Sequence, residues 1–259
     1  GIAGMKAAII GIAILSFVLT VLIAFVLDNP KEKLAKKAAE ATEKTSFLKD
    51  AKVIVKSPAT WLVALNVFAV YSFLNTLTYF TPYFTDVLGV TVVFTGWVAI
   101  ARQHGMTLVG APVGGFLSDL VKSPSKVLLG VYAVGVLGLI YLIQAGEGVG
   151  AAFLIALTLI MSAAVYIGRG SYYATVTEAG VSREYTASTI GLVAVGFSPD
   201  LFQFTMYGHW LDNYGNVAYT YIFIFQTIVL IVGALSAAGI LFLKKKHTVN
   251  SFNSSEGVA

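Results

Sequence analysis

Charge is scarce and cysteine is absent in this chain of 259 residues. Only 12% of its residues are charged and 57% are hydrophobic, whereas soluble domains carry roughly 25% charged residues. Because so few polar groups could not cover the surface of a water-soluble globule, the composition excludes a soluble enzyme, a disordered chain and a nucleic-acid binder. The lack of cysteine excludes a disulfide scaffold, an iron–sulfur site and a thiolate metal site. We expect no metal and no cofactor.

The start of the chain also lacks the features of a natural beginning. Residues Gly1 to Gly4 contain no initiator methionine, no charged flank and no cleavage site. A signal peptide would need the last two of these features. We therefore expect a fragment that begins at or just before a hydrophobic helix.

Long hydrophobic runs are what the chain has instead. A bilayer core about 30 Å thick is crossed by roughly 20 apolar helical residues. Seven stretches reach this length: 2–27, 59–85, 92–118, 126–145, 150–177, 187–211 and 216–243. The predicted fold is thus an all-α integral membrane protein with seven transmembrane helices, of which the last six form one bundle over 59–243.

The polar segments between these runs predict the orientation in the membrane. Residues 28–58 hold eight lysines and five acids, which indicates a water-exposed loop with a surface helix over 31–44. Fourteen of the 17 basic residues lie in this loop, in the connections after the third and fifth spans, or in the 244–259 tail, and the other three connections have none. The positive-inside rule therefore places the N-terminus outside and the C-terminus in the cytoplasm. Of the remaining three, Lys6 lies at the outer end of the first span.

The other two basic residues, Arg102 and Arg169, lie inside spans, as does Asp200 in the sixth. An ionised side chain facing lipid costs a few kcal/mol, so each should face protein or a water-filled cavity. One interpretation is a structural ion pair between Asp200 and one arginine. The other, which we favour for Arg102, is a cavity role, because two arginines against one acid leave a positive charge for an anionic substrate.

Polar side chains recur at helical spacing in two spans. One stripe consists of Tyr71, Asn75 and Tyr79, the other of Ser162, Tyr166, Arg169 and Tyr173, and Gln203 lies one turn beyond Asp200. Such stripes either form hydrogen bonds between helices or line a shared cavity, and together with a central arginine they favour the cavity. We expect His104 to be a packing residue. Glycines around Pro112 and the sequence Ser198-Pro199-Asp200 predict two hinges.

A short motif follows the third span. It reads Gly115-Phe116-Leu117-Ser118-Asp119 and continues to two lysines, Lys122 and Lys126. This resembles the cytoplasmic signature of the major facilitator superfamily, which has glycine, leucine two positions on, aspartate and then basic residues. Two further stretches are similar to helices 10 to 12 of bacterial sugar and organic-anion carriers in that superfamily: Arg169 to Arg183, and Gly196 to Tyr219.

The resemblance implies an architecture and a mechanism. Residues 1–27 would be helix 6, 28–58 the central cytoplasmic loop, 59–243 the C-terminal six-helix bundle, and 244–259 a cytoplasmic tail, in a multi-pass protein of the bacterial inner membrane that also needs its missing N-terminal half. Transport would proceed by alternating access. Gly115, Asp119, Glu178 and Arg183 would form a conformational switch, with Asp119 at the positive N-terminus of helix 11 near 186–188 and Glu178 paired with Arg183.

We therefore expect a secondary active transporter, not an enzyme, for an organic or sugar-acid anion driven by protons. The expected substrate-binding residues are Tyr71, Asn75, Tyr79, Arg102, Tyr166, Arg169 and Gln203, with Asp200 as a coupling or ion-pair residue. The alternative is a carrier of a neutral sugar or nucleoside whose arginines are tied up in ion pairs.

Other classes of seven-helix protein are disfavoured by missing features. A retinal protein needs a lysine in its last span, and here the first is Lys244 at the membrane edge. The motif after the third span does not supply the acidic-Arg-Tyr element of receptors, and the short loops leave no room for the filter of a channel. Three scattered histidines, at 104, 209 and 247, offer no set of catalytic groups or metal ligands for a membrane enzyme.

Overall fold

The computed structural model describes residues 2–27, 52–145 and 149–256, and every element assigned within them is a helix. The chain divides into two units, residues 1–51 and 52–259, each of which is considered by itself. The first unit contains α1 (Ile2–Leu27), whose described side chains between Ile9 and Ile23 are almost all exposed. A helix that is apolar on every side is suited to lipid or to other protein around it. The predicted surface helix over 31–44 lies outside the described residues.

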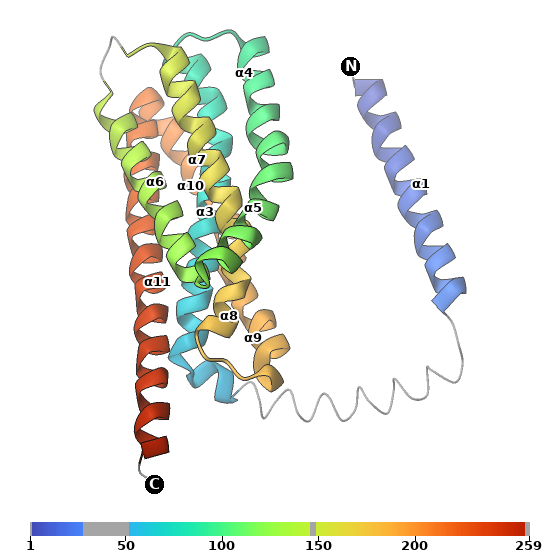
Figure 1. The fold of residues 1–259 in the computed structure, drawn as a ribbon. Helices are drawn as coiled ribbons and strands as arrows, with labels where there is room; N and C mark the ends of the chain where they lie inside the picture. Colours follow the sequence, from blue (N-terminus) through green and yellow to red (C-terminus); the bar gives the residue numbers. More distant parts are fainter. Residues whose placement is uncertain (1, 28–51, 146–148, 257–259) are drawn as a thin grey trace. The chain divides into compact units, whose positions relative to one another are not determined.

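The second unit is a bundle of helices (Figure 1). Its elements in chain order are α3 (Pro58–Asp86), α4 (Val92–Ile100), the π-helix η1 (Ala101–Gly105), α5 (Met106–Val121), α6 (Pro124–Gln144), α7 (Ala151–Ser171), η2 (Tyr172–Ala174), α8 (Thr175–Glu178), η3 (Arg183–Tyr185), α9 (Thr186–Val193), η4 (Ala194–Phe197), α10 (Pro199–Tyr214), η5 (Gly215–Val217) and α11 (Ala218–Glu256).

Each of the seven predicted spans falls on a helix or on consecutive helical segments. Four helical runs among the described residues are long and apolar enough to cross a membrane: Pro58–Asp86, Pro124–Gln144, Ala151–Glu178 and Arg183–Lys245, the last of which holds two predicted spans. The third predicted span, 92–118, is helical as well. Its mean hydropathy is lowered by three consecutive polar residues, Arg102, Gln103 and His104. The predicted all-α membrane fold is confirmed.

Prolines begin three of these helices, and one of them lies at a break between helical segments. Pro58, Pro124 and Pro199 occupy first-turn positions, where the missing N–H of proline costs nothing. At Ser198-Pro199-Asp200 the helix is irregular, because the 3₁₀ segment η4 ends just before α10 starts at Pro199, and a hinge at this place stays a prediction. Around Pro112 no break in the helix is assigned, since α5 runs through this proline. The irregular backbone lies upstream instead, in η1.

α5 and α7 are in close contact. A Cβ atom added to Gly114 would collide with the carbonyl oxygen of Ile167, and one added to Gly170 with that of Ala111. The two backbones therefore touch, as small residues in membrane helices allow. α5 with α7, α11 with α6 and α11 with α3 are the most extensive pairs. Large side chains such as Phe73, Phe80 and Tyr132 fill the core.

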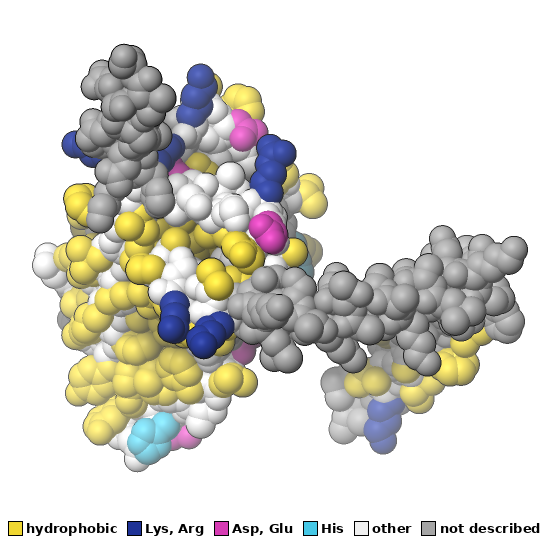
Figure 2. Space-filling model, turned by 90° about the horizontal axis from the view of Figure 1, so that it is seen from below, with side chains coloured by type: hydrophobic (Ala, Val, Ile, Leu, Met, Phe, Trp, Pro, Cys, Tyr) yellow, Lys and Arg dark blue, Asp and Glu magenta, His cyan; other side chains and the backbone are white. Residues whose placement is uncertain are grey.

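One end of the bundle carries the basic connections and is called the basic end below; it is defined by Lys122, Lys126, Arg183 and Lys244. In Figure 2, which looks at the bundle from below, Lys, Arg, Asp and Glu side chains are scattered among other polar side chains, and broad hydrophobic surface lies beside them. Contacts confirm that these connections meet, because the Lys244 ammonium lies 3.1 Å from Glu178 and 3.4 Å from the carbonyl oxygen of Lys122.

Candidate functional site

Arg102 is buried within the bundle with only part of its guanidinium group satisfied. It lies in η1, a π-helix, which is a frequent irregularity at functional sites. Its exposed fraction is 3%. Nη2 donates a hydrogen bond of 2.7 Å to Thr81 on α3, and the guanidinium carbon lies 5.6 Å from the ring centre of Phe80. Nη1 is buried and has no partner. No carboxylate pairs with Arg102 anywhere in the part of the chain that the structure describes.

Tyr166 of α7 completes the surroundings of this arginine. Its side chain is 2% exposed, and it lies within electrostatic range of Arg102. Gly110 of α5 makes the approach possible, because a Cβ there would stand 2.5 Å from the Cβ of Tyr166. The structure thus brings two of the predicted site residues, Arg102 and Tyr166, to the same place.

A second group of predicted residues gathers between α3, α7 and α10. Asn75 donates a hydrogen bond of 2.8 Å from Nδ2 to Oδ1 of Asp200. Tyr71, one turn before Asn75, interacts with Asp200 and is also influenced by the charge of Arg169. Asp200 and Arg169 are exposed on the surface of this bundle, and Tyr71 is half-buried. We call Tyr71, Asn75, Asp200 and Arg169 the polar face.

The expected ion pair between Asp200 and an arginine does not form in the described part of the chain. Asp200 accepts its hydrogen bond from Asn75 instead. Arg102 is held at Thr81, which is six residues beyond Asn75 on α3 and therefore about 9 Å further along the helix axis at 1.5 Å per residue. Arg169 has no hydrogen-bond or ion-pair partner among the described residues. Both arginines are therefore free of the carboxylate that we expected one of them to bind.

Gln203 lies behind the polar face in a buried network. This network, which we call the amide network, consists of Ser72, Asn75, Thr76, Gln203, Tyr207 and Gln226. The Gln203 Nε2 group lies 2.7 Å from the Tyr207 hydroxyl and 3.1 Å from the carbonyl oxygen of Ser72. Gln226 Oε1 accepts hydrogen bonds of 2.8 Å from the Ser72 and Thr76 hydroxyls. Gln203 and Gln226 are both fully buried.

The other residues of the two stripes have local partners. Tyr79 is half-buried, donates to the carbonyl oxygen of Phe204 at 3.3 Å and packs edge-on against Tyr207. Ser162 is buried and donates to the carbonyl oxygen of Thr158. Tyr173 is half-buried against Tyr172. His104, which we expected to pack, is exposed in this bundle, because it projects from a different side of η1 than buried Arg102.

Glu178 organises the basic end. Its carboxylate accepts hydrogen bonds from the Ser123 hydroxyl at 2.6 Å and the Ser125 N–H at 2.8 Å, and it pairs with Lys244 at 3.1 Å. The side chain of Glu178 is 3% exposed, and that of Lys244 is 47% exposed. One carboxylate thereby joins the α5–α6 turn, the end of α8 and α11.

The expected pairing of Glu178 with Arg183 is not present, because both carboxylate oxygens turn toward the α5–α6 turn and Lys244. Arg183 and Asp119 are exposed, and neither has an ion-pair partner among the described residues. Asp119 shares a cavity of about 580 Å³ with Glu178 and Lys244, and residues 186–188 are not part of its lining. Gly115 has open space around the position of a Cβ.

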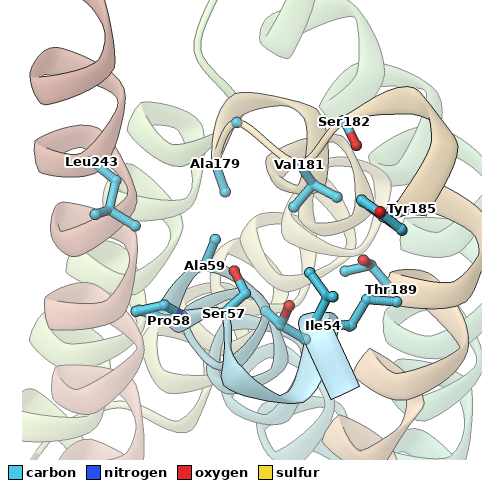
Figure 3. A pocket seen from close by; sticks show the side chains of 13 residues that line it. Ile54, Ser57, Pro58, Ala59, Ala179, Val181, Ser182, Tyr185, Thr189 and Leu243 are labelled. Carbon is cyan, nitrogen blue, oxygen red and sulfur yellow. The ribbon is translucent and has the colours of Figure 1, made fainter. Parts of the chain in front are cut away.

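A second cavity at the basic end, of about 320 Å³, contains none of the predicted site residues. Figure 3 shows its wall, formed by apolar side chains such as Ile54, Val181 and Leu243, together with the hydroxyl-bearing Ser182 and Tyr185. No charged side chain lines it. The cavity is therefore separate from the arginines and from Asp200.

Several partners in these sites could not be recognised in the sequence. Thr81 holds Arg102, and Ser123, Ser125 and Lys244 hold Glu178, but threonine, serine and lysine are common in such positions. Gln226 did have a signal, since it is an amide inside an otherwise apolar span, where a polar side chain is expensive.

Comparison with known proteins identifies the family. The sequence profile of the Major Facilitator Superfamily matches residues 1–199. Inner membrane protein YihN of Escherichia coli K12 is 31% identical over 233 residues, which cover 86% of this chain and 54% of that protein. Inner membrane protein YqcE of the same strain is 30% identical over 194 residues, covering 73% of this chain and 45% of that protein. No solved structure matches significantly.

The chain therefore spans about half the length of the curated relatives it matches. The profile match includes the motif at Gly115 to Asp119 and extends to Pro199, where α10 begins. The resemblance inferred from those residues is confirmed: this chain belongs to the Major Facilitator Superfamily.

Proposed function

We propose that the chain is part of a secondary active transporter of the inner membrane that carries a small organic anion. The observation that carries this proposal is Arg102, a charge buried in a membrane bundle with an unpartnered Nη1 group. A buried charge without a carboxylate is costly, and an anionic group on the substrate would offset that cost. Arg169, exposed on the polar face, would provide a second positive charge.

An uptake assay on the full-length protein tests this role. The probes are gluconate, glucuronate and glucose 6-phosphate as anions, and glucose as a neutral molecule. Replacing Arg102 by Ala should reduce anion uptake about 100-fold, because charge-assisted hydrogen bonds contribute up to roughly 3 kcal/mol. Arg102→Lys should restore only part of the loss, since lysine lacks the forked geometry of arginine.

The matched control is Lys126→Ala, which removes an exposed positive charge at the basic end and should leave uptake unchanged. Anion uptake that survives both Arg102 variants would contradict the anion site. Uptake of glucose by the parent protein in preference to all three anions would support the second candidate, a carrier of a neutral sugar. That candidate is weakened by the absence of the ion pairs it requires among the described residues.

Coupling to protons would use Asp200. It is the acidic residue of the polar face, and it is exposed next to Asn75 and Tyr71, where both substrate and water could reach it. We propose that Asp200→Asn abolishes accumulation of the anion against a gradient but leaves exchange of anion across the membrane. Active accumulation by that variant would exclude Asp200 as the coupling residue.

Alternating access would use the basic end as one of its two gates. Gly115, Asp119, Glu178 and Arg183 are proposed to act there, with Glu178 as the group that ties three elements together. Breaking such contacts favours the state that lacks them.

A further inference from the structure

The amide network lies directly behind the polar face and fixes the orientation of Asn75. Its members come from α3, α10 and α11, and Asn75 and Gln203 are 128 positions apart in the sequence. Asn75 is 8% exposed, whereas Gln203 and Gln226 are fully buried. Asn75 is thus the member through which the buried network reaches the surface.

Hydrogen-bond direction determines how each amide is turned. The carbonyl oxygen of Ser72 can only accept, so the Gln203 atom 3.1 Å away from it is the amide nitrogen. The Tyr207 and Thr76 hydroxyls and Gln226 Oε1 surround the same nitrogen. The oxygen of Gln203 must then point the other way, toward Asn75.

Asn75 in turn can present only its nitrogen to its two neighbours. Gln203 Oε1 lies 3.4 Å from Asn75 Nδ2, and Asp200 Oδ1 lies 2.8 Å from the same atom. Both neighbours are acceptors, so the amide group of Asn75 cannot be reversed without facing oxygen with oxygen. Its own oxygen, Oδ1, accepts no hydrogen bond among the described residues, and it is not one of the fully buried atoms without a partner.

The network thus has two acceptor groups near the surface: the Oδ1 atom of Asn75, and the exposed carboxylate of Asp200, which also interacts with Tyr71. Hydroxyl groups are suited to donate to such a pair. Arg102 is anchored about 9 Å further along α3, counted as six residues of 1.5 Å. A ligand with an anionic group at Arg102 and hydroxyls at Asn75 would need several carbons between the two, because Thr81 and Asn75 also lie on different sides of α3.

We propose that the transported molecule is a polyhydroxylated organic anion, and that Gln203 is a positioning residue which holds Asn75 ready to bind its hydroxyls. This inference rests on the proposed transport of an anion and adds the chemical class of the substrate. Gln203 acts through Asn75 and does not itself need to touch the ligand. Gln226 and Tyr207 contribute by accepting hydrogen bonds from the amide nitrogen of Gln203.

Uptake by the full-length protein tests the proposal with two hydroxylated probes, gluconate and glucose 6-phosphate, and one hydroxyl-free probe, hexanoate. The parent protein should take up at least one hydroxylated probe about tenfold better than hexanoate, as one additional hydrogen bond predicts. Gln203→Leu should raise the KM for that probe about tenfold with little change in kcat. In an Asn75→Leu background, the same Gln203 change should have no further effect, because the residue through which it acts is gone.

Asn66→Leu is the matched control. Asn66 is a fully buried amide of the same helix α3, bonded to Ser236 and Tyr132 and not connected to Asp200. It should lower thermal stability as Gln203→Leu does, and leave the preference for the hydroxylated probe intact. An equal KM defect in both variants would show a merely structural effect and overturn the positioning role.

Two other outcomes show which part of the proposal has failed: the substrate class or the role of Gln203. If neither hydroxylated probe is taken up better than hexanoate, the proposed substrate class is wrong, although transport of hexanoate dependent on Arg102 would still support an anion carrier. If Gln203→Leu lowers uptake further in the Asn75→Leu background, Gln203 acts independently of Asn75 and is not its positioning residue.

Discussion

At the scale of single residues, neighbouring positions of one motif have opposite environments. Gly114 faces α7 so closely that a Cβ would strike the backbone of Ile167, whereas a Cβ on Gly115 would meet nothing within 4 Å. Backbone atoms cannot move aside as the tip of a side chain can. Gly114 is therefore required for the α5–α7 contact, and Gly115 is not.

Alanine should lower stability at Gly114 but not at Gly115. Gly114→Ala should lower the free energy of unfolding by about 1–3 kcal/mol, the usual cost of overpacking. Gly115→Ala should be neutral or stabilising by up to roughly 1 kcal/mol, because alanine is the better helix former. Thermal unfolding of the purified full-length protein in detergent measures both. Equal melting temperatures for the two variants would contradict the α5–α7 packing.

At the scale of elements, Glu178 shows how one carboxylate holds several helix ends. Two of its three partners, the Ser123 hydroxyl and the Ser125 N–H, are well shielded with it, whereas Lys244 is 47% exposed. Exposed ion pairs contribute about 0–1 kcal/mol. Hydrogen bonds to a charged group contribute about 1.5–3 kcal/mol each. The serine contacts should therefore dominate.

Replacing Glu178 and Lys244 in separate variants should reveal this difference. Glu178→Ala should destabilise the protein by about 2 kcal/mol or more, because buried donors lose their acceptor, and it should slow anion uptake by disturbing the proposed gate. Lys244→Met should cost less than about 1 kcal/mol. Glu184→Ala, which removes an exposed acid of η3, serves as the control and should change neither quantity. If uptake and stability stay at the parent values in Glu178→Ala, Glu178 is not part of the gate.

At the scale of the whole molecule, the distribution of basic residues predicts which end faces the cytoplasm. Lys122, Lys244 and Glu178 meet at one end of the bundle, so basic connections that are distant in sequence share one side. The connection at 87–91 contains no basic residue. The basic end should therefore be cytoplasmic and the N-terminus of α1 outside.

The absence of cysteine makes this orientation simple to measure. With any cysteine in the remainder of the protein replaced, Thr91→Cys should react with a membrane-impermeant maleimide in intact cells. Ser182→Cys, in an exposed position at the basic end, should react only after the cells are permeabilised. The reverse pattern would invert the topology.

The sequence by itself determined the solvent, the helices and the family. The length of a hydrophobic run and the placement of charges depend only on the boundary between lipid and water, so spans such as 59–85 could be predicted directly from the sequence. The motif at Gly115 to Asp119 identified the superfamily. The individual site residues Arg102, Asn75, Asp200 and Glu178 were also visible, because polar groups are rare in this chain.

Only the tertiary structure decided their partners. Asp200 binds Asn75 rather than an arginine, Arg102 binds Thr81, and Glu178 binds Ser123 and Lys244 rather than Arg183. The physical reason is that a hydrogen bond requires two atoms within about 3 Å in a suitable direction. Between residues 21 to 125 positions apart, that condition is set by how α3, η1, α8, α10, α11 and the α5–α6 turn pack, which helical periodicity within each span does not specify.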